Sequence, residues 1–247
     1  TNHPRMLSAL EKCKENGGQI ITVNPLPEAG LINFTNPQRF GKMLTGGTKL
    51  SDLFLQVKVN GDIALLKAIM LILLEEEQKS PGFVIDHDFI KEKTVDYEAF
   101  LEHLQQHRLE NLIDECGVPE ELIRAAADMI KFRKKIILCW AMGLTQHENG
   151  VANIQEVVNF LLMKGAIGKP GAGTCPVRGH SNVQGDRTVG IWEAPKPEFL
   201  DRMEQHFGFK PPRRHGYAVV DAIKAMYEGK GKVFFAMGGN FISATPD

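Results

Sequence analysis

The segment from Gly165 to Gly190 contains the residues best suited to bind a ligand or to do chemistry. It combines glycines with a run of polar and charged side chains: Arg178, His180, Asn182, Gln184, Asp186 and Arg187. Such side chains suit an anionic ligand rich in heteroatoms, and glycine lets the backbone approach a ligand closely. Loops this long are usually functional or disordered. A flexible linker would be rich in serine and glycine, or acidic. Because this segment instead interleaves its glycines with arginine, histidine and amide side chains, the composition favours a loop that binds a ligand.

Arg178 is the candidate for anion binding in this loop. It lies between Val177 and Gly179, and Asp186 is the nearest carboxylate in the segment. A guanidinium without an acidic partner is suited to bind a carboxylate or a phosphate; the alternative is a structural salt bridge. His180 could titrate near neutral pH, although a lone histidine seldom acts as a base.

Two further segments carry groups that could contact a nucleotide or a pterin. Backbone N–H groups where a helix starts after Ala141–His147 would favour a phosphate, and Gln146 could reach the edge of a base or pterin; the alternative is a polar turn. His147 is more typical of a helix cap or a surface than of a metal ligand. Asp62 fits a helix N-cap, or it could accept two hydrogen bonds from guanine. No GxGxxG follows a strand and no GxxxxGK[ST] occurs, so NAD and P-loop binding lack their motifs.

Alternating helices and short apolar strands must position these groups. The spacing predicts strands at Gln19–Val23, Leu53–Val59, Lys135–Trp140 and Lys232–Met237. It predicts helices at Met6–Glu15, Ile63–Glu77, Glu120–Phe132, Val151–Lys164, Pro197–Phe207 and Val219–Glu228, with a helical region from Asp86 to Leu112. This order indicates an α/β fold with a mainly parallel sheet. Polar segments follow the strands at 24–25, 142–150 and 238–240, where such sheets bind ligands.

The composition limits which binding partners and which cellular compartment we expect for this protein. The formal net charge of -1 gives no general field for nucleic acid or for a membrane surface. The longest apolar run, Ala68–Leu74, is too short to span a bilayer, and no signal peptide is visible. The four cysteines are scattered without a CxxC pair, so we expect no metal site from this chain alone and a cytoplasmic location. The start at Thr1 suggests a piece of a longer polypeptide.

Five segments, in this order and at these distances, resemble the catalytic subunit of molybdopterin-dependent formate dehydrogenases, within the dimethyl sulfoxide reductase family. The segments are NHPRML, GDIALLKA, CWAMGLTQHENGV, GAIGKPGAGTCPVRGHSNVQG and FFAMGGNF. The resemblance extends to formate-dehydrogenase-like alpha (molybdopterin) subunits and covers essentially the whole chain. One departure is RGHSNVQG, where formate dehydrogenases usually have RGQNNVQG.

The resemblance implies a bis-molybdopterin guanine dinucleotide cofactor, with molybdenum or tungsten, held between two Rossmann-like domains. The implied fold is a doubly wound, mainly parallel α/β sheet with helices on both faces, plus part of a neighbouring α/β domain. Residues 1–180 would form the domain that binds the cofactor. Residues 181–247 would be a partial segment that returns to the adjacent cofactor-binding domain.

The family also implies roles for individual residues. The arginine of PVRG lies beside the metal in the family and orients the substrate, and that position is Arg178. His180 stands where a pterin-contacting glutamine is usual, and Asn24 and Leu26 depart from the family turn Asp-Pro-Arg. The cofactor-binding positions that the resemblance implies are Asn24, Pro25, Asp62, Met142, Gly143, Gln146, Gly179, His180, Gly239 and Asn240.

In the family, the cysteine or selenocysteine that ligates the metal and the iron–sulfur cysteines would lie upstream of Thr1. We therefore expect a fragment of a formate dehydrogenase-like oxidoreductase, inactive alone, whose parent acts on a small anion such as formate. Its partners would be the remaining domains of the parent and an electron-transfer subunit. Two alternatives are a guanine nucleotide-binding module without redox chemistry and a folded scaffold with an empty site.

Overall fold

The computed structural model describes residues 4–36, 46–179, 182–236 and 239–244. The chain divides into two compact units, Thr1–Gly179 (unit 1) and His180–Asp247 (unit 2). This division falls one residue before the boundary expected from the sequence. The assignment of the first part to cofactor binding stays a prediction.

Unit 1 contains short strand pairs, two of them parallel. The pairs are β1 (Ile21–Val23) with β4 (Leu53–Leu55), parallel; β5 (Ile137–Trp140) with β6 (Gly173–Pro176), parallel; and β2 (Asn33–Phe34) with β3 (Thr48–Lys49), antiparallel. Within the described residues, no hydrogen-bonded ladder joins one pair to another. Parallel strands that alternate with helices confirm the α/β fold class.

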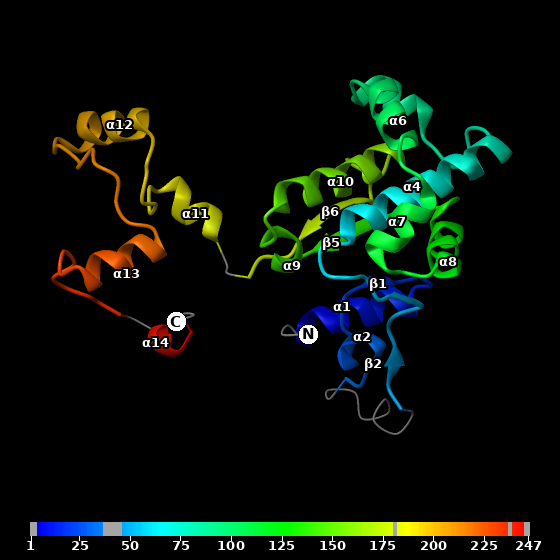
Figure 1. Ribbon diagram of the computed structural model, residues 1–247, viewed down its shortest axis with the longest axis horizontal. Helices are drawn as coiled ribbons and strands as arrows, with labels where there is room; N and C mark the ends of the chain where they lie inside the picture. Colours follow the sequence, from blue (N-terminus) through cyan, green and yellow to red (C-terminus); the bar gives the residue numbers. More distant parts are fainter. Residues whose placement is uncertain (1–3, 37–45, 180–181, 237–238, 245–247) are drawn as a thin grey trace. The chain divides into compact units, whose positions relative to one another are not determined.

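Helix α4 is the centre of unit 1. The helices of this unit are α1 (Pro4–Glu15), α2 (Ala29–Ile32), α4 (Asp62–Lys79), α5 (His87–Lys93), α6 (Tyr97–Gln105), α7 (Leu109–Cys116), α8 (Glu120–Ile130), α9 (Met142–Thr145) and α10 (Gly150–Met163). Helices α7, α8 and α10 pack against α4 (Figure 1). Because α4 is apolar around most of its circumference, it is buried on several sides; Ala68, Met70 and Leu73 are fully buried.

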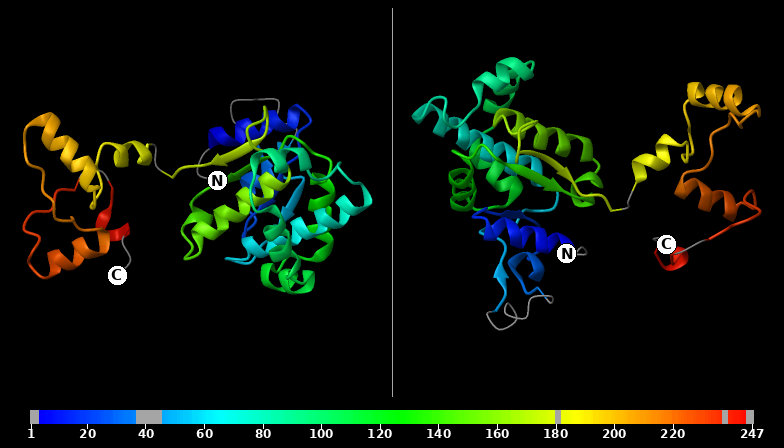
Figure 2. Two further views of the ribbon diagram at one scale, coloured as in Figure 1. Left: turned by 90° about the horizontal axis from the view of Figure 1, so that it is seen from above. Right: turned by 180° about the vertical axis from the view of Figure 1, so that it is seen from behind.

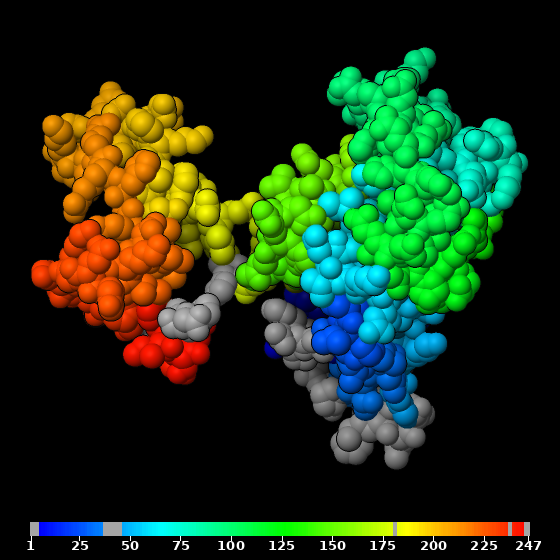
Figure 3. Space-filling view, in the orientation of Figure 1, coloured from blue at the N-terminus to red at the C-terminus, as the bar shows by residue number. Residues whose placement is uncertain are grey.

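A second, smaller core of Leu7, Phe34 and Leu50 serves the N-terminal elements. These elements are blue in Figure 3, which shows them at the lower end of unit 1, beneath the cyan and green part. The separation of the two cores follows from the short strands, since a two- or three-residue strand has little apolar surface to join them.

Two of the predicted elements of unit 1 differ from those observed by more than two residues at an end. The strand predicted at Leu53–Val59 ends at Leu55, because the amide of Val57 turns back to donate to the Leu55 carbonyl at 3.1 Å. The helical region predicted from Asp86 to Leu112 is divided into α5, α6 and the start of α7. Asp96, with a φ of 58°, begins α6 in a left-handed conformation and so separates it from α5.

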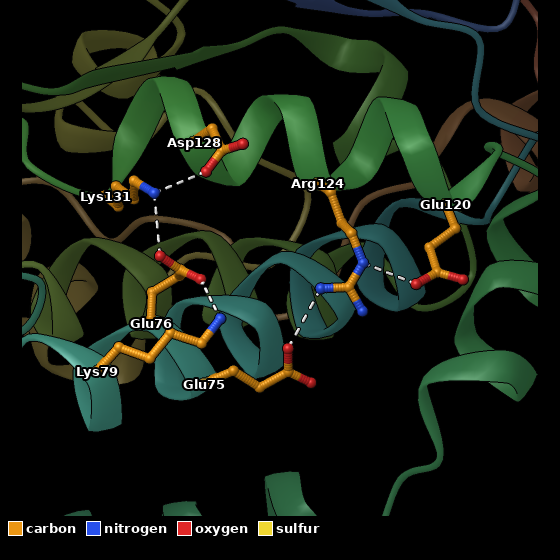
Figure 4. Close-up of polar contacts among 7 residues, drawn as sticks. All are labelled: Glu75, Glu76, Lys79, Glu120, Arg124, Asp128 and Lys131. Atoms are coloured by element: carbon orange, nitrogen blue, oxygen red, sulfur yellow. Dashed lines mark hydrogen bonds and ion pairs between the residues drawn. The ribbon is translucent and has the colours of Figure 1, made fainter.

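Arg124 of α8 and Lys131, which follows the last turn of this helix, link α8 to α4, as Figure 4 shows. Arg124 lies 3.2 Å from Glu75 of α4 and 2.7 Å from Glu120 of its own helix. Lys131 lies 3.0 Å from Glu76. The network is completed by Asp128 and Lys79. Each exposed ion pair contributes little to stability. We therefore infer that the main effect of this network is to fix the register between α4 and α8.

Lys164 is a buried cation at the end of α10, with 1% of its surface exposed. Its Nζ donates to the backbone carbonyl of Val84 and to that of Lys131, the latter at 2.7 Å. Desolvation, with a smaller effect from Lys134, lowers the pKa of Lys164 to about 8. The ammonium therefore joins the ends of α8 and α10 to the segment before α5, at the cost of burying a charge.

This burial predicts that stability rises with pH. Between pH 8 and 10.5, folded Lys164 has lost its proton while the unfolded side chain keeps it, so the unfolded state binds more protons and deprotonation favours folding. The free energy of unfolding should rise by up to about 3 kcal/mol across this window. In Lys164→Met the rise should be absent. Urea unfolding on either side of the window measures the difference, and an equal rise in both chains would contradict the assignment.

Unit 2 consists of helices joined by extended segments, as Figure 2 shows. The helices are α11 (Val183–Thr188), α12 (Pro197–Phe207), α13 (Val219–Tyr227) and α14 (Phe241–Ala244). The strand predicted at Lys232–Met237 is wrong for residues 232–236, and Met237 lies outside the described residues. These residues are apolar enough for a strand, but in the described part of the chain no strand forms backbone hydrogen bonds with them.

Candidate functional site

Four loops leave the carboxyl ends of the parallel strands of unit 1. They are residues 24–26 after β1, 56–61 after β4, 141–149 after β5, which includes α9, and 177–179 after β6. Because each pair is parallel, its two loops emerge at the same edge. This is the edge at which open α/β sheets bind ligands.

The first two loops contact each other directly. The amide of Asn24 donates to the Leu55 carbonyl at 3.2 Å, and Gln56 Nε2 donates to the Pro25 carbonyl at 3.0 Å. Asn24 Nδ2 also donates to the Leu26 carbonyl at 2.5 Å, which closes the turn. The predicted pair Asn24 and Pro25 is therefore fixed against the start of the loop after β4.

The last two loops are also neighbours. The amide of Val177 donates to the Trp140 carbonyl at 2.7 Å. A Cβ atom at Gly179 would overlap the sulfur of Met142, so the Met142 side chain lies against the Gly179 backbone. Gly143 is exposed, and a Cβ atom there would meet no other atom within 4 Å. The structure thus brings together Met142 and Gly179, two of the predicted cofactor-binding residues.

Arg178 follows Val177 in this second group of loops. Its side chain is exposed. It makes no ion pair or hydrogen bond with any residue in the part of the chain that the structure describes. The alternative of a structural salt bridge has no support within these residues. The guanidinium is therefore available to an anion.

A hydrogen bond between His147 and Asn60 joins the two groups of loops. His147 Nδ1 lies 2.9 Å from Asn60 Oδ1. Asn60 has a φ of 69°, a left-handed conformation that asparagine tolerates better than most residues. It precedes Gly61 and Asp62, so the contact places the loop after β5 beside the start of α4.

Asp62 is the first residue of α4, and Gly61 occupies the N-cap position. The prediction that Asp62 is the N-cap is therefore wrong by one residue, because the preceding turn at Asn60 starts the helix earlier. Asp62 is partly buried. Desolvation raises the pKa of its carboxyl group, and the nearby charge of His147 lowers it in part. A carboxylate that has lost water is a strong acceptor for N–H donors of a ligand.

We expect the substitution His147→Gln to change the pKa of Asp62. The neutral amide removes the positive charge that lowers the Asp62 pKa, so the pKa of Asp62 should rise further. Carboxyl carbon chemical shifts measured across the titration report it directly. His87→Gln is the control, since His87 pairs with Glu77 elsewhere in unit 1. An unchanged Asp62 titration in His147→Gln would contradict the coupling.

Asn60→Gly tests the hydrogen bond itself. Glycine accepts the positive φ but removes the Oδ1 acceptor, so the free energy of unfolding should fall by about 0.5–1.5 kcal/mol. Asp96→Gly is the matched control, because Asp96 also has a positive φ but makes no side-chain cap hydrogen bond. Equal stability changes in the two variants, measured by urea unfolding, would assign the Asn60 effect to backbone conformation alone.

The remaining predicted residues are Gln146, Gly239, Asn240 and His180. Gln146 is exposed at the end of α9, next to His147. Gly239 and Asn240 are exposed residues of unit 2 before α14, and His180 lies outside the described residues. A surface hollow of about 460 Å³ lies along α10, between Thr145 and Asn159, and none of the predicted residues lines it.

Sequence reasoning missed Asn60 and Gln56, which connect the loops. An available signal was the dipeptide Asn60-Gly61, which is typical of tight turns and directly follows the strand predicted at Leu53–Val59. Nothing in the sequence indicated that Gln56 would bind the Pro25 carbonyl. Among the described residues, no cluster of three or more His, Cys, Asp or Glu could hold a metal ion. None of the described helices is long and apolar enough to cross a membrane.

The chain is similar over its whole length to longer proteins. It is 49% identical over 247 residues to an uncharacterized oxidoreductase of Mycobacterium tuberculosis, of which it covers 32%. It is 42% identical over 252 aligned positions to the protein YdeP of Escherichia coli, of which it covers 33%. The chain thus spans about one third of the length of these relatives. No family model matches it.

Two further similarities concern named enzymes. The alpha subunit of F420-dependent formate dehydrogenase 1 from Methanococcus maripaludis is 33% identical over 188 residues, which are 76% of this chain and 24% of that subunit. Acetylene hydratase from Pelobacter acetylenicus has a TM-score of 0.53 at 18% identity, over 66% of this chain and 19% of the enzyme, and so shares the fold. These matches support the resemblance that the motifs indicated: the chain is related to segments of longer oxidoreductases, and a formate dehydrogenase alpha subunit is among its relatives.

Proposed function

We propose that this chain holds part of a bis-molybdopterin guanine dinucleotide cofactor, with molybdenum or tungsten, along the four loops of unit 1. The observation that carries the proposal is the chain of contacts that connects all four loops. Asn24 bonds to Leu55, Asn60 to His147, and Trp140 to Val177. A long ligand with a guanine at one end and a pterin at the other matches a row of loops better than a single pocket.

The residues of these loops fit the chemical groups of such a ligand. Asp62 is a partly buried acceptor suited to the N–H groups of a guanine. The exposed amide of Gln146 can donate to and accept from a pterin edge. Gly143 has no side chain and open space beside it, so the backbone there can approach a ligand closely. The missing side chain of Gly179 makes room for Met142. We place His180, Gly239 and Asn240 at the pterins on the strength of the family motif alone.

The cofactor would supply the redox chemistry, as is general for enzymes of this kind. Arg178 would bind the carboxylate of a small anionic substrate such as formate through two parallel hydrogen bonds. Its role is orientation: a fixed guanidinium holds the substrate in one pose relative to the reacting centre. Since the chain spans one third of its relatives, we propose this activity for the parent protein and expect the chain alone to be inactive.

The remaining parts of the proposal concern the surroundings of the parent. We propose that it works in the cytoplasm, where four free cysteines would stay reduced. It would pass electrons to an electron-transfer subunit, and an iron–sulfur cluster would lie in a part of the parent outside this chain.

A second candidate function is guanine nucleotide binding without redox chemistry. Asp62 and the turn at Asn24 favour it. Asp62 could accept hydrogen bonds from a guanine without any metal being present. A folded scaffold without a ligand is the third alternative, and it predicts that neither cofactor nor nucleotide binds.

Metal analysis and pterin fluorescence of the full-length protein test the first proposal, and GDP titration of the 247-residue chain tests the second. Molybdenum or tungsten in stoichiometric amount, with an oxidised-pterin fluorescence signal, supports the cofactor. GDP binding by the chain without metal or pterin in the full-length protein would favour the nucleotide module. Absence of all three signals would leave the scaffold.

A further inference from the structure

Two cysteines lie opposite each other in the parallel pair of β5 and β6. Cys139 is in register with Cys175, and both are exposed and free. The register places the two thiols beside each other, and the neighbouring Cys175 adds to the effect of desolvation in raising the pKa of the Cys139 thiol. The other two cysteines are separate from this pair: Cys116 is buried and Cys13 belongs to α1.

The backbone geometry of the pair suits a covalent link. Neighbouring strands lie about 4.7–4.9 Å apart, and disulfides connect residues whose Cα atoms are about 4.4–6.8 Å apart. Because Cys139 and Cys175 are paired in register, their side chains leave the same face of the strand pair. Closing the bond therefore requires rotation of two side chains and little movement of the backbone.

We propose that Cys139 and Cys175 form a redox-sensitive dithiol, which closes to a disulfide between β5 and β6 when a low-molecular-weight disulfide such as oxidised glutathione accepts the electrons. The Cys175 thiolate attacks one sulfur of the oxidant, whose S–S bond breaks and releases one thiol. Cys139 then loses its proton and attacks the Cys175 sulfur, which releases the second thiol. Two protein thiols are oxidised, and one external disulfide is reduced to two thiols.

The order of attack follows from the surroundings of Cys139. Desolvation, together with the neighbouring Cys175, raises the pKa of the Cys139 thiol to about 11. Because the thiolate is the nucleophile, Cys139 is a poor first attacker. It becomes effective in the second step, where its partner sulfur lies beside it and the reaction is intramolecular.

The proposed bond lies directly before the two loops that contact each other in the second half of the candidate site. Cys139 is followed by Trp140 and the loop to α9, and Cys175 is followed by Pro176 and the loop with Arg178. A disulfide here would fix the separation of these loops. The inference itself concerns the thiols and does not rest on the proposed function.

The test treats the reduced 247-residue chain with oxidised glutathione, then alkylates free thiols and digests without reduction. We expect a peptide pair linked through Cys139 and Cys175, with the loss of two hydrogens, and no glutathione left on either residue. In Cys139→Ser, the glutathione adduct on Cys175 should persist because no thiol resolves it. In Cys175→Ser, the adduct on Cys139 should form more slowly. Circular dichroism confirms that each variant is folded.

Cys13→Ser is the background for all of these measurements, because it removes the other exposed thiol. Stable glutathione adducts on both Cys139 and Cys175 of the unsubstituted pair would overturn the proposal. So would a disulfide that forms only between two molecules, which non-reducing electrophoresis detects. Equal persistence of the Cys175 adduct with and without Cys139 would also overturn it.

Discussion

Replacing Arg178 by alanine in the full-length protein should lower turnover by about 100- to 1000-fold, the effect typical of losing one group that stabilises a reacting charge. Its guanidinium is exposed and makes no ion pair with a described residue, so the fold should lose little with it. A substrate with only a carboxylate to hold would lose its main orienting contact. Turnover with formate and cofactor content, measured on the same preparation, give the result.

The matched control is Arg187→Ala, which removes another arginine of the same glycine-rich segment. Arg187 stacks over Trp192 with its guanidinium carbon 5.4 Å from the ring centroid, and we expect its loss to leave turnover nearly unchanged. Arg178→Lys should restore only part of the activity, because an ammonium cannot form the two parallel hydrogen bonds. If Arg178→Ala also loses the cofactor, Arg178 is a cofactor-binding residue and not a substrate-orienting one.

Asp62→Asn should weaken binding of the guanine end of the cofactor and stabilise the folded chain at neutral pH. The asparagine amide would point an N–H donor at the N–H donor of a guanine, so the hydrogen bond is lost. Losing a hydrogen bond to a charged group costs about 1.5–3 kcal/mol, which is about 10- to 100-fold in affinity. Pterin content of the full-length protein after gel filtration measures retention, and GDP titration measures the guanine site alone.

The stability effect of Asp62→Asn has the opposite direction. The folded pKa of Asp62 lies above its unfolded value of 3.8, so ionisation favours the unfolded state and stability falls as pH rises through this window. In Asp62→Asn the neutral amide does not ionise, so this fall in stability should be smaller than in the unsubstituted chain. Thermal unfolding at several pH values in the acid range measures the difference. Asp88→Asn, an exposed aspartate in the first turn of α5, is the control. Lower stability of Asp62→Asn at neutral pH would contradict the assignment.

Local signals in the sequence predicted the helices well. Pro197–Phe207 matches α12 residue for residue, because Pro197 starts the helix and Gly208, with a φ of 71°, ends it. Lys232–Ala236 shows the limit of such signals. An apolar run becomes a strand only when another strand supplies its hydrogen bonds, and that partner is not encoded in the run itself.

The candidate site was predictable in its positions and not in its connections. The placement of Asn24 and Met142 after strands followed from the alternation of apolar and polar segments. Arg178 follows β6, a strand that the glycine-rich sequence did not predict. The bond from His147 to Asn60 joins residues 87 positions apart, and no local pattern encodes it. The same holds for the contact of Met142 with Gly179, which depends on two strands lying side by side.

The two parallel strand pairs of unit 1 share no backbone ladder among the described residues. A cofactor that touches loops from both pairs would therefore supply connections that hydrogen bonds supply in a continuous sheet. A ligand present at about 100 times its Kd adds about 2.7 kcal/mol to the stability of the folded state, a large fraction of what a typical domain has. Loading the cofactor would then be a step of protein maturation, and chains that have not received it would be the preferred substrates of cellular proteases.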